Sequence, residues 1–340
     1  MDISDSSQKV ALGHGSGGAM MQQFITEQLL PALGGQSAEG LEDAATLSIS
    51  AADIAFTTDS FTVQPLFFPG GDIGSLAVHG TVNDLAMRGA TPRYLSLGLI
   101  IEEGLPLDTL RRIVQSIGQA ARDCDVIIAC GDTKVVGRGA ADAIFINTSG
   151  IGECGDHIPS VTAATPGDRV LVNGTLGDHG VAVMMAREDL QISSAVESDT
   201  APLHTLVGAM LEAGGEAVHT LRDLTRGGLA AGVNEIVAAS GVGITLEAAT
   251  IPVRPEVGGA CEVLGLSPYA VANEGKLVAM VAPEAAEKVL AAMRAHPLGR
   301  NACIIGEVAA EPVATVRLHT PIGTTRILEL PAGELLPRIC

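Results

Sequence analysis

Aromatic side chains are scarce in this chain: there is no tryptophan, and aromatic residues make up only 2% of 340 positions. Stacking of bases and sugars on aromatic rings is therefore disfavoured. Basic residues are also few, since 20 Lys and Arg face 39 Asp and Glu and give a formal net charge of -19. Such an acidic chain is a poor candidate for binding nucleic acid or an anionic membrane.

Long apolar runs are missing as well, because none approaches the ~18 residues needed to span a bilayer. The opening residues, Met1 to Asp5, lack the basic and apolar regions of a signal peptide. We therefore expect a cytoplasmic protein whose six cysteines stay reduced. None of them forms a Cys-x-x-Cys pair, which disfavours zinc and iron–sulfur sites. Cys124 and Cys130 bracket an apolar run that predicts a buried strand.

The length and the 47% hydrophobic content predict two domains, each with its own core. Alternating strand and helix patterns indicate an α/β (α+β) fold. We predict a glycine-rich arm and helix over 1–40, a first domain over 41–161, a second, mixed domain over 168–330 and a flexible tail over 331–340.

The predicted elements follow from apolar periodicity. Strands are expected at 46–49, 54–58, 94–101, 125–130, 144–152, 169–173, 243–246, 276–281 and 313–318. Helices are expected at 20–33, 73–88, 106–122, 179–187, 203–213, 228–240 and 283–295. The helix over 73–88 is apolar on more than one side, which predicts that it is buried.

Four aspartates lie in short polar islands between apolar segments: Asp43, Asp59, Asp84 and Asp223. Each one alone is better explained by a cap or a turn. Asp84 differs because it lies inside the buried helix, where an unpaired carboxylate is costly. Taken together, the four carboxylates suit Mg²⁺ bound with a nucleotide, since magnesium favours oxygen ligands and substrate phosphates.

Glycine-rich and strand-adjacent motifs supply further candidates. Gly15, Ser16, Gly17 and Gly18 precede a predicted helix and can offer backbone N–H groups to phosphate, although a flexible arm explains them equally well. They are not a P-loop, because no Gly-Lys-Ser/Thr follows.

Two charged residues near predicted strands are candidates for chemistry. Lys134, in Gly131-Asp132-Thr133-Lys134, follows a predicted strand and can contact phosphate or stabilise developing charge; the alternative is a solvated surface lysine. Glu274, in Ala272-Asn-Glu-Gly-Lys276, is a possible acid or base, or simply part of a turn. The eight histidines show no metal spacing, and we assign none of them to catalysis.

The last residue of the sequence, Cys340, follows a segment in which Pro331, Gly333 and Pro337 discourage regular structure. Ten extended residues reach about 33–36 Å. A thiol on such a tail can enter another protein's site and return to its own. The alternative is a frayed terminus or an apolar plug.

The ordered set of motifs resembles the HypE family, the carbamoyl dehydratases of nickel–iron hydrogenase maturation, over essentially the whole chain. The resemblance is carried by Gly13-His-Gly-Ser-Gly-Gly18, Thr58-Asp-Ser60, Pro65-Leu-Phe-Phe-Pro-Gly-Gly71, Asn83-Asp-Leu-Ala86, Gly131-Asp-Thr-Lys-Val-Val136, Gly177-Asp-His-Gly180, Arg222-Asp-Leu-Thr-Arg-Gly-Gly228, Ala272-Asn-Glu-Gly-Lys276 and Pro337-Arg-Ile-Cys340.

This resemblance implies the fold of the aminoimidazole-ribonucleotide-synthetase superfamily, which includes selenophosphate synthetase. It implies a homodimer whose N-terminal sheets form a barrel, with ATP and Mg²⁺ bound in a cleft beside it. The implied ATP and magnesium residues are Gly15, Ser16, Gly17, Gly18, Asp43, Asp59, Asn83, Asp84, Asp132 and Asp223, with the metal on Asp43, Asp59, Asp84 and Asp223. The superfamily often has Asp-Asp where this chain has Glu42-Asp43.

The activity that the resemblance implies is dehydration of a carbamoyl group on Cys340 to a thiocyanate, with Lys134 and Glu274 activating or deprotonating the substrate group. A carbamoyltransferase, HypF, would load Cys340, and a HypC–HypD complex would accept cyanide for its iron. Two other readings stay open. One is a different ATP-dependent enzyme of the superfamily that phosphorylates a small metabolite, and the other is a non-catalytic scaffold for maturation partners.

Overall fold

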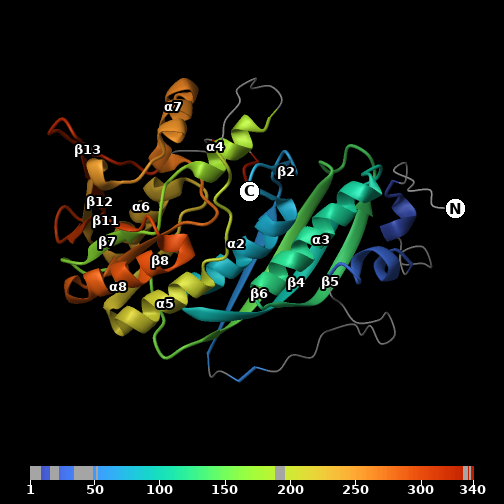
Figure 1. Ribbon diagram of the computed structural model, residues 1–340, viewed down its shortest axis with the longest axis horizontal. Coiled ribbons are helices and arrows are strands. Elements are labelled where there is room, and N and C mark those ends of the chain that lie inside the picture. Colours follow the sequence, from blue (N-terminus) through green and yellow to red (C-terminus); the bar gives the residue numbers. More distant parts are fainter. Residues whose placement is uncertain are drawn as a thin grey trace.

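The computed structural model describes residues 9–15, 23–33, 49–50, 53–187, 196–331, 336 and 338–340. The predicted site residues Ser16, Gly17, Gly18 and Asp43 lie outside these ranges, as does most of the strand predicted at 46–49. The described residues build two large sheets with helices packed on them and one small two-stranded sheet, and the C-terminal residue lies between the two halves, close to β2 (Figure 1).

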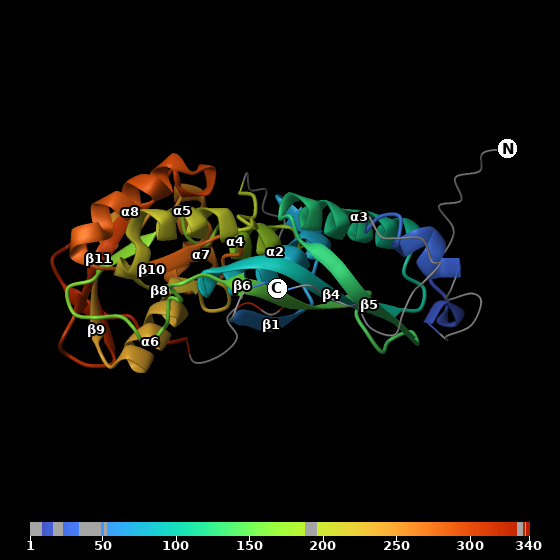
Figure 2. The ribbon, with the colours of Figure 1, turned by 90° about the horizontal axis from the view of Figure 1, so that it is seen from below.

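The first sheet has four strands in the order β1-β6-β4-β5. They are β1 (Ile54–Phe61), β4 (Ala90–Glu102), β5 (Ile127–Val136) and β6 (Ile144–Cys154). Only β4 and β5 run parallel; the other pairs are antiparallel. Helices α2 (Ile73–Met87) and α3 (Leu107–Asp123) cover one face, and no described helix covers the other (Figure 2). A small hairpin of two short antiparallel strands, β2 (Phe67–Phe68) and β3 (Gly71–Asp72), leads into α2.

The second sheet has seven strands in the order β13-β12-β9-β11-β7-β10-β8. They are β7 (Arg169–Val172), β8 (Val218–Asp223), β9 (Gly243–Glu247), β10 (Leu277–Val281), β11 (Cys303–Ala309), β12 (Thr315–His319) and β13 (Thr325–Ile327). The helices of this half are α4 (Asp178–Met185), α5 (His204–Gly214), α6 (Gly228–Ser240), α7 (Pro255–Leu264) and α8 (Pro283–Ala295). The predicted strands and helices of this half appear, and β8, β11, β13 and α7 are additional elements that the periodicity did not indicate.

Helix α2 is buried nearly all round, as its sequence predicts. Asp72 caps its first turn, because the carboxylate accepts hydrogen bonds from the backbone N–H groups of Gly74 and Ser75. One side of α2 packs against α3 and the first sheet, and it also contacts α5 and β8 of the second half. Residues of α2 are therefore placed where the two halves meet.

The first sheet has a packed face and an open face, and the side chains of β4 alternate between them from Leu95 to Ile101. Leu95, Leu97, Leu99 and Ile101 of β4 are buried beneath the helices. On the opposite face, Phe56 pairs with Ile151, Ile151 with Tyr94 and Tyr94 with Ile127, which gives an apolar row across all four strands. The exposed fractions of Phe56 and Ile127 are 68% and 60%. Within one chain this sheet is open, so the barrel implied by the resemblance stays a prediction about a dimer.

Strand β5 corrects two expectations. The segment 125–130 was expected to be a buried strand, but β5 begins at Ile127, lies at the sheet edge, and exposes Ile127 and Cys130. An edge strand with one open face needs apolar residues on a single face only. The motif 131–134 was expected to follow the strand, and it lies within it instead. No helix in the described part of the chain is long and apolar enough to cross a membrane.

Candidate active site

Three of the predicted carboxylates meet where the two halves join. Asp59 comes from β1, Asp84 from α2 and Asp223 from the end of β8. The charge of Asp84 acts on the neighbouring Asp59, and the Thr57 hydroxyl donates to Asp84 Oδ2 at 2.8 Å. Asp84 and Asp223 line one cavity of about 220 Å³ between β1, α2 and β8. The structure thus joins residues 164 positions apart (223 − 59) in one acidic site.

Glu274 lies beside these aspartates and is 2% exposed. Its Oε1 has no hydrogen-bond partner among the described residues. The amide of Asn83 fixes the local backbone: it donates to Glu274 O at 3.2 Å and Ala201 O at 3.1 Å and accepts from Leu203 N at 2.7 Å. The side chain of Asn83, which was predicted to bind the cofactor, therefore holds the backbone segment that carries Glu274.

Burial and mutual repulsion change the acidity of this cluster. Burial first, and then the charge of Asp84, raises the pKa of Asp59 to about 7. The same two causes raise the pKa of Asp223 to about 6. Burial, with the nearby charges of Asp223, Asp199 and Asp59, raises the pKa of Glu274 well above its ordinary value. Carboxylates held together in this way favour a proton or a cation between them.

A stability prediction follows from the sign of these shifts. Because the folded chain binds more protons than the unfolded chain, the free energy of unfolding of the ligand-free protein is expected to fall as pH rises from about 4 to 7. For the buried Asp223 alone the loss is on the order of 3 kcal/mol. Denaturant unfolding at several pH values measures it. A ligand-free stability that rises over this range would contradict the arrangement.

The carboxylates of the cluster are of the type that could hold magnesium together with a nucleotide. No group of three or more His, Cys, Asp or Glu side chains in the described ranges is arranged to hold a metal ion by itself. Magnesium usually keeps waters and phosphate oxygens among its ligands, and it binds proteins through one or two carboxylates. The raised pKa values of Asp59 and Asp223 and the unpartnered Oε1 of Glu274 indicate a site with an excess of negative charge.

Arg226 is a functional candidate that the sequence reasoning did not single out. Its positive charge lowers the pKa values of Asp59 and Glu274, which places it beside the acidic cluster. It also lines a second cavity, of about 460 Å³, together with Cys340. The signal was available in the motif 222–228, where Arg226 follows Asp223 by three residues.

The tail is docked at this second cavity, although the sequence predicts it to be flexible. Backbone N–H groups of Thr62 and Gln64, just after β1, donate to the carbonyl oxygens of Cys340 at 3.0 Å and Arg338 at 3.1 Å. Arg338 Nε donates back to Thr62 O at 3.1 Å. The described end of the tail therefore extends the edge of β1 as a short paired segment, and Cys340 is half-buried there.

Apolar contacts complete this docking. The side chains of Leu336 and Ile339 are 8% and 4% exposed, and both belong to the core that includes α2 and α3. The ring of His179 bonds the Ile339 carbonyl at 2.8 Å. Apolar anchors in the sequence Leu336-Pro-Arg-Ile339 explain why a segment rich in helix breakers still has a fixed place.

Lys134 and Asp132 do not meet the carboxylates within one chain. Asp59 pairs with the buried Thr148, so it faces the helices, whereas Asp132 and Lys134 pair with Gly98 and Ile100 on the open face and are exposed. They also stand on β5, at the opposite edge of the sheet from β1. Three strand spacings separate these edges, about 14 Å. Gly15 ends a short 3-10 turn at Leu12–Gly15, and its phosphate role stays a prediction.

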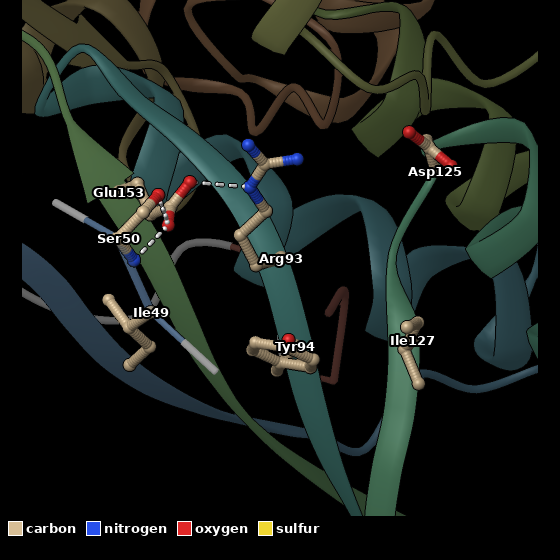
Figure 3. Close-up of a pocket in the computed structure, with 7 residues that line it drawn as sticks. All are labelled: Ile49, Ser50, Arg93, Tyr94, Asp125, Ile127 and Glu153. Atoms are coloured by element: carbon tan, nitrogen blue, oxygen red, sulfur yellow. Dashed lines mark hydrogen bonds and ion pairs between the residues drawn. The ribbon is translucent and has the colours of Figure 1, made fainter. Parts of the chain in front are cut away.

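A third cavity, of about 440 Å³, lies on the open face of the first sheet (Figure 3). Seven residues line it: Ile49, Ser50, Arg93, Tyr94, Asp125, Ile127 and Glu153. Its one arginine is already paired with Glu153 at 2.7 Å, and Glu153 also accepts from the Ser50 N–H and hydroxyl. Arg93 and Glu153 are paired with each other, which leaves Asp125 as the other charged residue of this lining, so the cavity lacks the several convergent carboxylates of the acidic site.

The fold and the acidic cleft define a class of protein. The family "AIR synthase related protein" matches with its N-terminal domain at residues 41–154 and its C-terminal domain at residues 165–319. A relative from Bradyrhizobium diazoefficiens, carbamoyl dehydratase HypE, is 53% identical over 332 residues, which cover 97% of this chain and 96% of that protein. The chain belongs to the HypE family of AIR synthase related proteins.

Two solved structures are similar to the chain in its three-dimensional form. Hydrogenase maturation protein HypE in complex with ATP has a TM-score of 0.92 and 46% identity, over 97% of this chain and 99% of that one. A HypE chain from a HypE–HypF complex has a TM-score of 0.80 and 48% identity, over 92% and 100%.

Proposed function

We propose that this chain dehydrates an S-carbamoyl group on its own Cys340 to a thiocyanate, using ATP, and thereby supplies cyanide for hydrogenase iron in the cytoplasm. The observation that carries the proposal is the position of Cys340. It lies in a cavity with Arg226, whose charge acts on the carboxylates of the neighbouring cleft. Similarity to a HypE structure that contains ATP supports the nucleotide.

The atoms balance as an ATP-driven loss of water. The carbonyl oxygen of the S-carbamoyl group receives the terminal phosphoryl group of ATP and leaves as phosphate, while the nitrogen loses two protons and the carbon gains a triple bond to nitrogen. The products are the thiocyanate on Cys340, ADP and phosphate. Mg²⁺ bound with ATP would supply charge neutralisation, and Asp59, Asp84 and Asp223, with Asp43 from the sequence, would hold it.

The chain's own residues have distinct tasks in this proposal. Glu274 is positioned by Asn83 and takes protons from the carbamoyl nitrogen, because a buried carboxylate of raised pKa is a stronger base than an ordinary glutamate. Arg226 faces the oxygen that becomes anionic and stabilises its developing charge. Residues 15–18 would contact the phosphates through backbone N–H groups.

Lys134 and Asp132 serve the site of a partner copy in this proposal. The open face of the first sheet, with its apolar row, is the surface through which a HypE-like homodimer would form. Thr62 follows Phe61, whose strand partner is Ile146, so it stands level with Phe145, Ile100 and Lys134. Lys134 therefore stands at the same level of the sheet as the docked end of the tail. In the proposed dimer, the sheet of the partner copy packs on the open face and brings the partner's Lys134 to the docked Cys340.

Partners follow from the same chemistry. A carbamoyltransferase of the HypF kind would load Cys340, which the HypE–HypF complex among the similar structures supports. A HypC–HypD complex would receive the cyanide. Both exchanges require Cys340 to leave the docked position that the structure describes.

The experiment that tests the proposal is mass spectrometry of the C-terminal peptide after incubation with ATP, Mg²⁺, carbamoyl phosphate and the carbamoyltransferase. The expected product is a peptide that carries the carbamoyl group minus one water, and only when ATP is present. A carbamoylated peptide that never loses water with ATP, although the protein is folded and binds ATP, would overturn the dehydratase reading.

A further inference from the structure

The ring of His179 is fully enclosed between the docked tail and the loop that enters α5. Its Nε2 lies 2.8 Å from Ile339 O, and its Nδ1 lies 2.8 Å from Ser198 Oγ. A carbonyl oxygen can only accept, so Nε2 carries the hydrogen and donates to Ile339. Nδ1 then accepts from the Ser198 hydroxyl. Burial lowers the pKa of His179, which agrees with a neutral ring.

The motif around His179 is shaped for the tail. Gly177, in the left-handed region with φ 84°, is the N-cap of α4 and turns the chain so that His179 lies in its first turn. Gly180 has no room for a Cβ, because a methyl group there would collide with Val271 and press on Leu336. Gly177-Asp-His-Gly180 therefore forms one wall of the tail's docking position.

Two further residues reinforce this position from outside. Arg187, near the end of α4, donates to Arg338 O at 3.2 Å. Arg338 also forms an ion pair with Asp142. These two contacts are at least partly exposed to solvent, whereas the His179 contact is completely buried and has the greater weight.

We propose that His179 is a positioning residue, which latches the tail in its docked position through the hydrogen bond from Nε2 to the Ile339 carbonyl. This inference rests on the proposed function, in which Cys340 is loaded away from the site and processed within it. This hydrogen bond determines the fraction of time that the Cys340 thiol spends in the cavity. Loosening it then favours loading and disfavours dehydration.

Two substitutions separate the hydrogen bond from Nε2 to Ile339 from the other contacts of the His179 side chain. His179→Gln can place an amide N–H close to the position of Nε2, whereas His179→Asn reaches only the position of Nδ1 and loses the bond to Ile339. The measurement is the rate at which a maleimide labels Cys340 in the full-length protein, followed by mass spectrometry of the C-terminal peptide. An unsatisfied buried carbonyl is expected to increase the rate about 5- to 100-fold in His179→Asn, with His179→Gln close to wild type.

Matched controls exclude general loosening. His157 Nε2 bonds Val218 O at the same 2.8 Å, but Val218 belongs to β8 and not to the tail, so His157→Asn should leave Cys340 labelling unchanged. Cys124 is 2% exposed, and its labelling reports global unfolding within the same sample. Cys340 labelling that rises only in step with Cys124 labelling, or equally in the Asn and Gln variants, would overturn the latch.

The two half-reactions give a second readout. In His179→Asn, transfer of the carbamoyl group to Cys340 should be as fast as in wild type or faster, while its dehydration slows; His179→Gln should restore both. Equal slowing of both steps would contradict a latch. Labelling requires no chemistry at the site, so failure of the dehydratase proposal would leave the labelling result interpretable.

Discussion

A purified heterodimer of one Lys134→Ala chain and one Cys340→Ser chain is expected to dehydrate its carbamoyl group at about half the wild-type rate per dimer, since one of its two equivalent sites is intact. Each variant alone as a homodimer is expected to be inactive. The reason is geometric: Lys134 stands on the open face of an edge strand, across the sheet from Thr62 and the docked Cys340. A lysine supplied by the partner chain restores the site.

The reciprocal heterodimer makes this test sharp. One wild-type chain paired with a chain that carries both substitutions should be inactive, because the only Cys340 faces the partner's Ala at position 134. If Lys134 acts within its own chain, the two heterodimers exchange behaviour: the doubly substituted pair keeps half of the activity and the complementing pair has none. Lys134 is exposed, so its truncation should not disturb folding. Two different affinity tags allow each heterodimer to be isolated.

Periodicity predicted what depends on local sequence. Helix α2 and strand β1 begin where the apolar pattern places them, and the burial of α2 follows from its apolar character on more than one side. The carboxylates at 59, 84 and 223 could be proposed as a set because each interrupts an apolar segment. Their meeting at one point depends on how α2 packs against β8, which no local pattern specifies.

The misinterpretations arise from long-range contacts. An apolar run at 125–130 gives the same signal whether both faces of a strand are buried or a single open face awaits a partner, so β5 was expected in the interior. The docked tail was expected only as the alternative of an apolar plug, because Pro331 and Pro337 exclude regular structure without excluding a fixed position. Arg226 and His179 escaped prediction because their partners, Cys340 and Ile339, lie more than a hundred residues away.

Glu274→Gln is expected to slow the dehydration step about 100- to 10,000-fold, the usual range for loss of a general base, while loading of Cys340 and binding of ATP persist. The same change should make the ligand-free protein more stable at pH 8, because it removes a carboxylate that burial and three neighbouring aspartates oppose. Single-turnover dehydration and denaturant unfolding measure the two effects. Activity and stability are expected to move in opposite directions.

Asp199→Asn is the matched control, since Asp199 lies in the same cluster but is paired. Its Oδ2 lies 2.9 Å from Lys276 Nζ, and its Oδ1 accepts the backbone N–H of Glu274 at 3.0 Å. Removing this charge leaves the largely enclosed Lys276 without its ion-pair partner and should cost about 3–5 kcal/mol of stability. Two acidic residues in direct contact are thus expected to respond with opposite signs. If Glu274→Gln destabilised the chain as Asp199→Asn does, Glu274 would be a structural partner in the core, and the base would have to be sought among Asp59, Asp84 and Asp223.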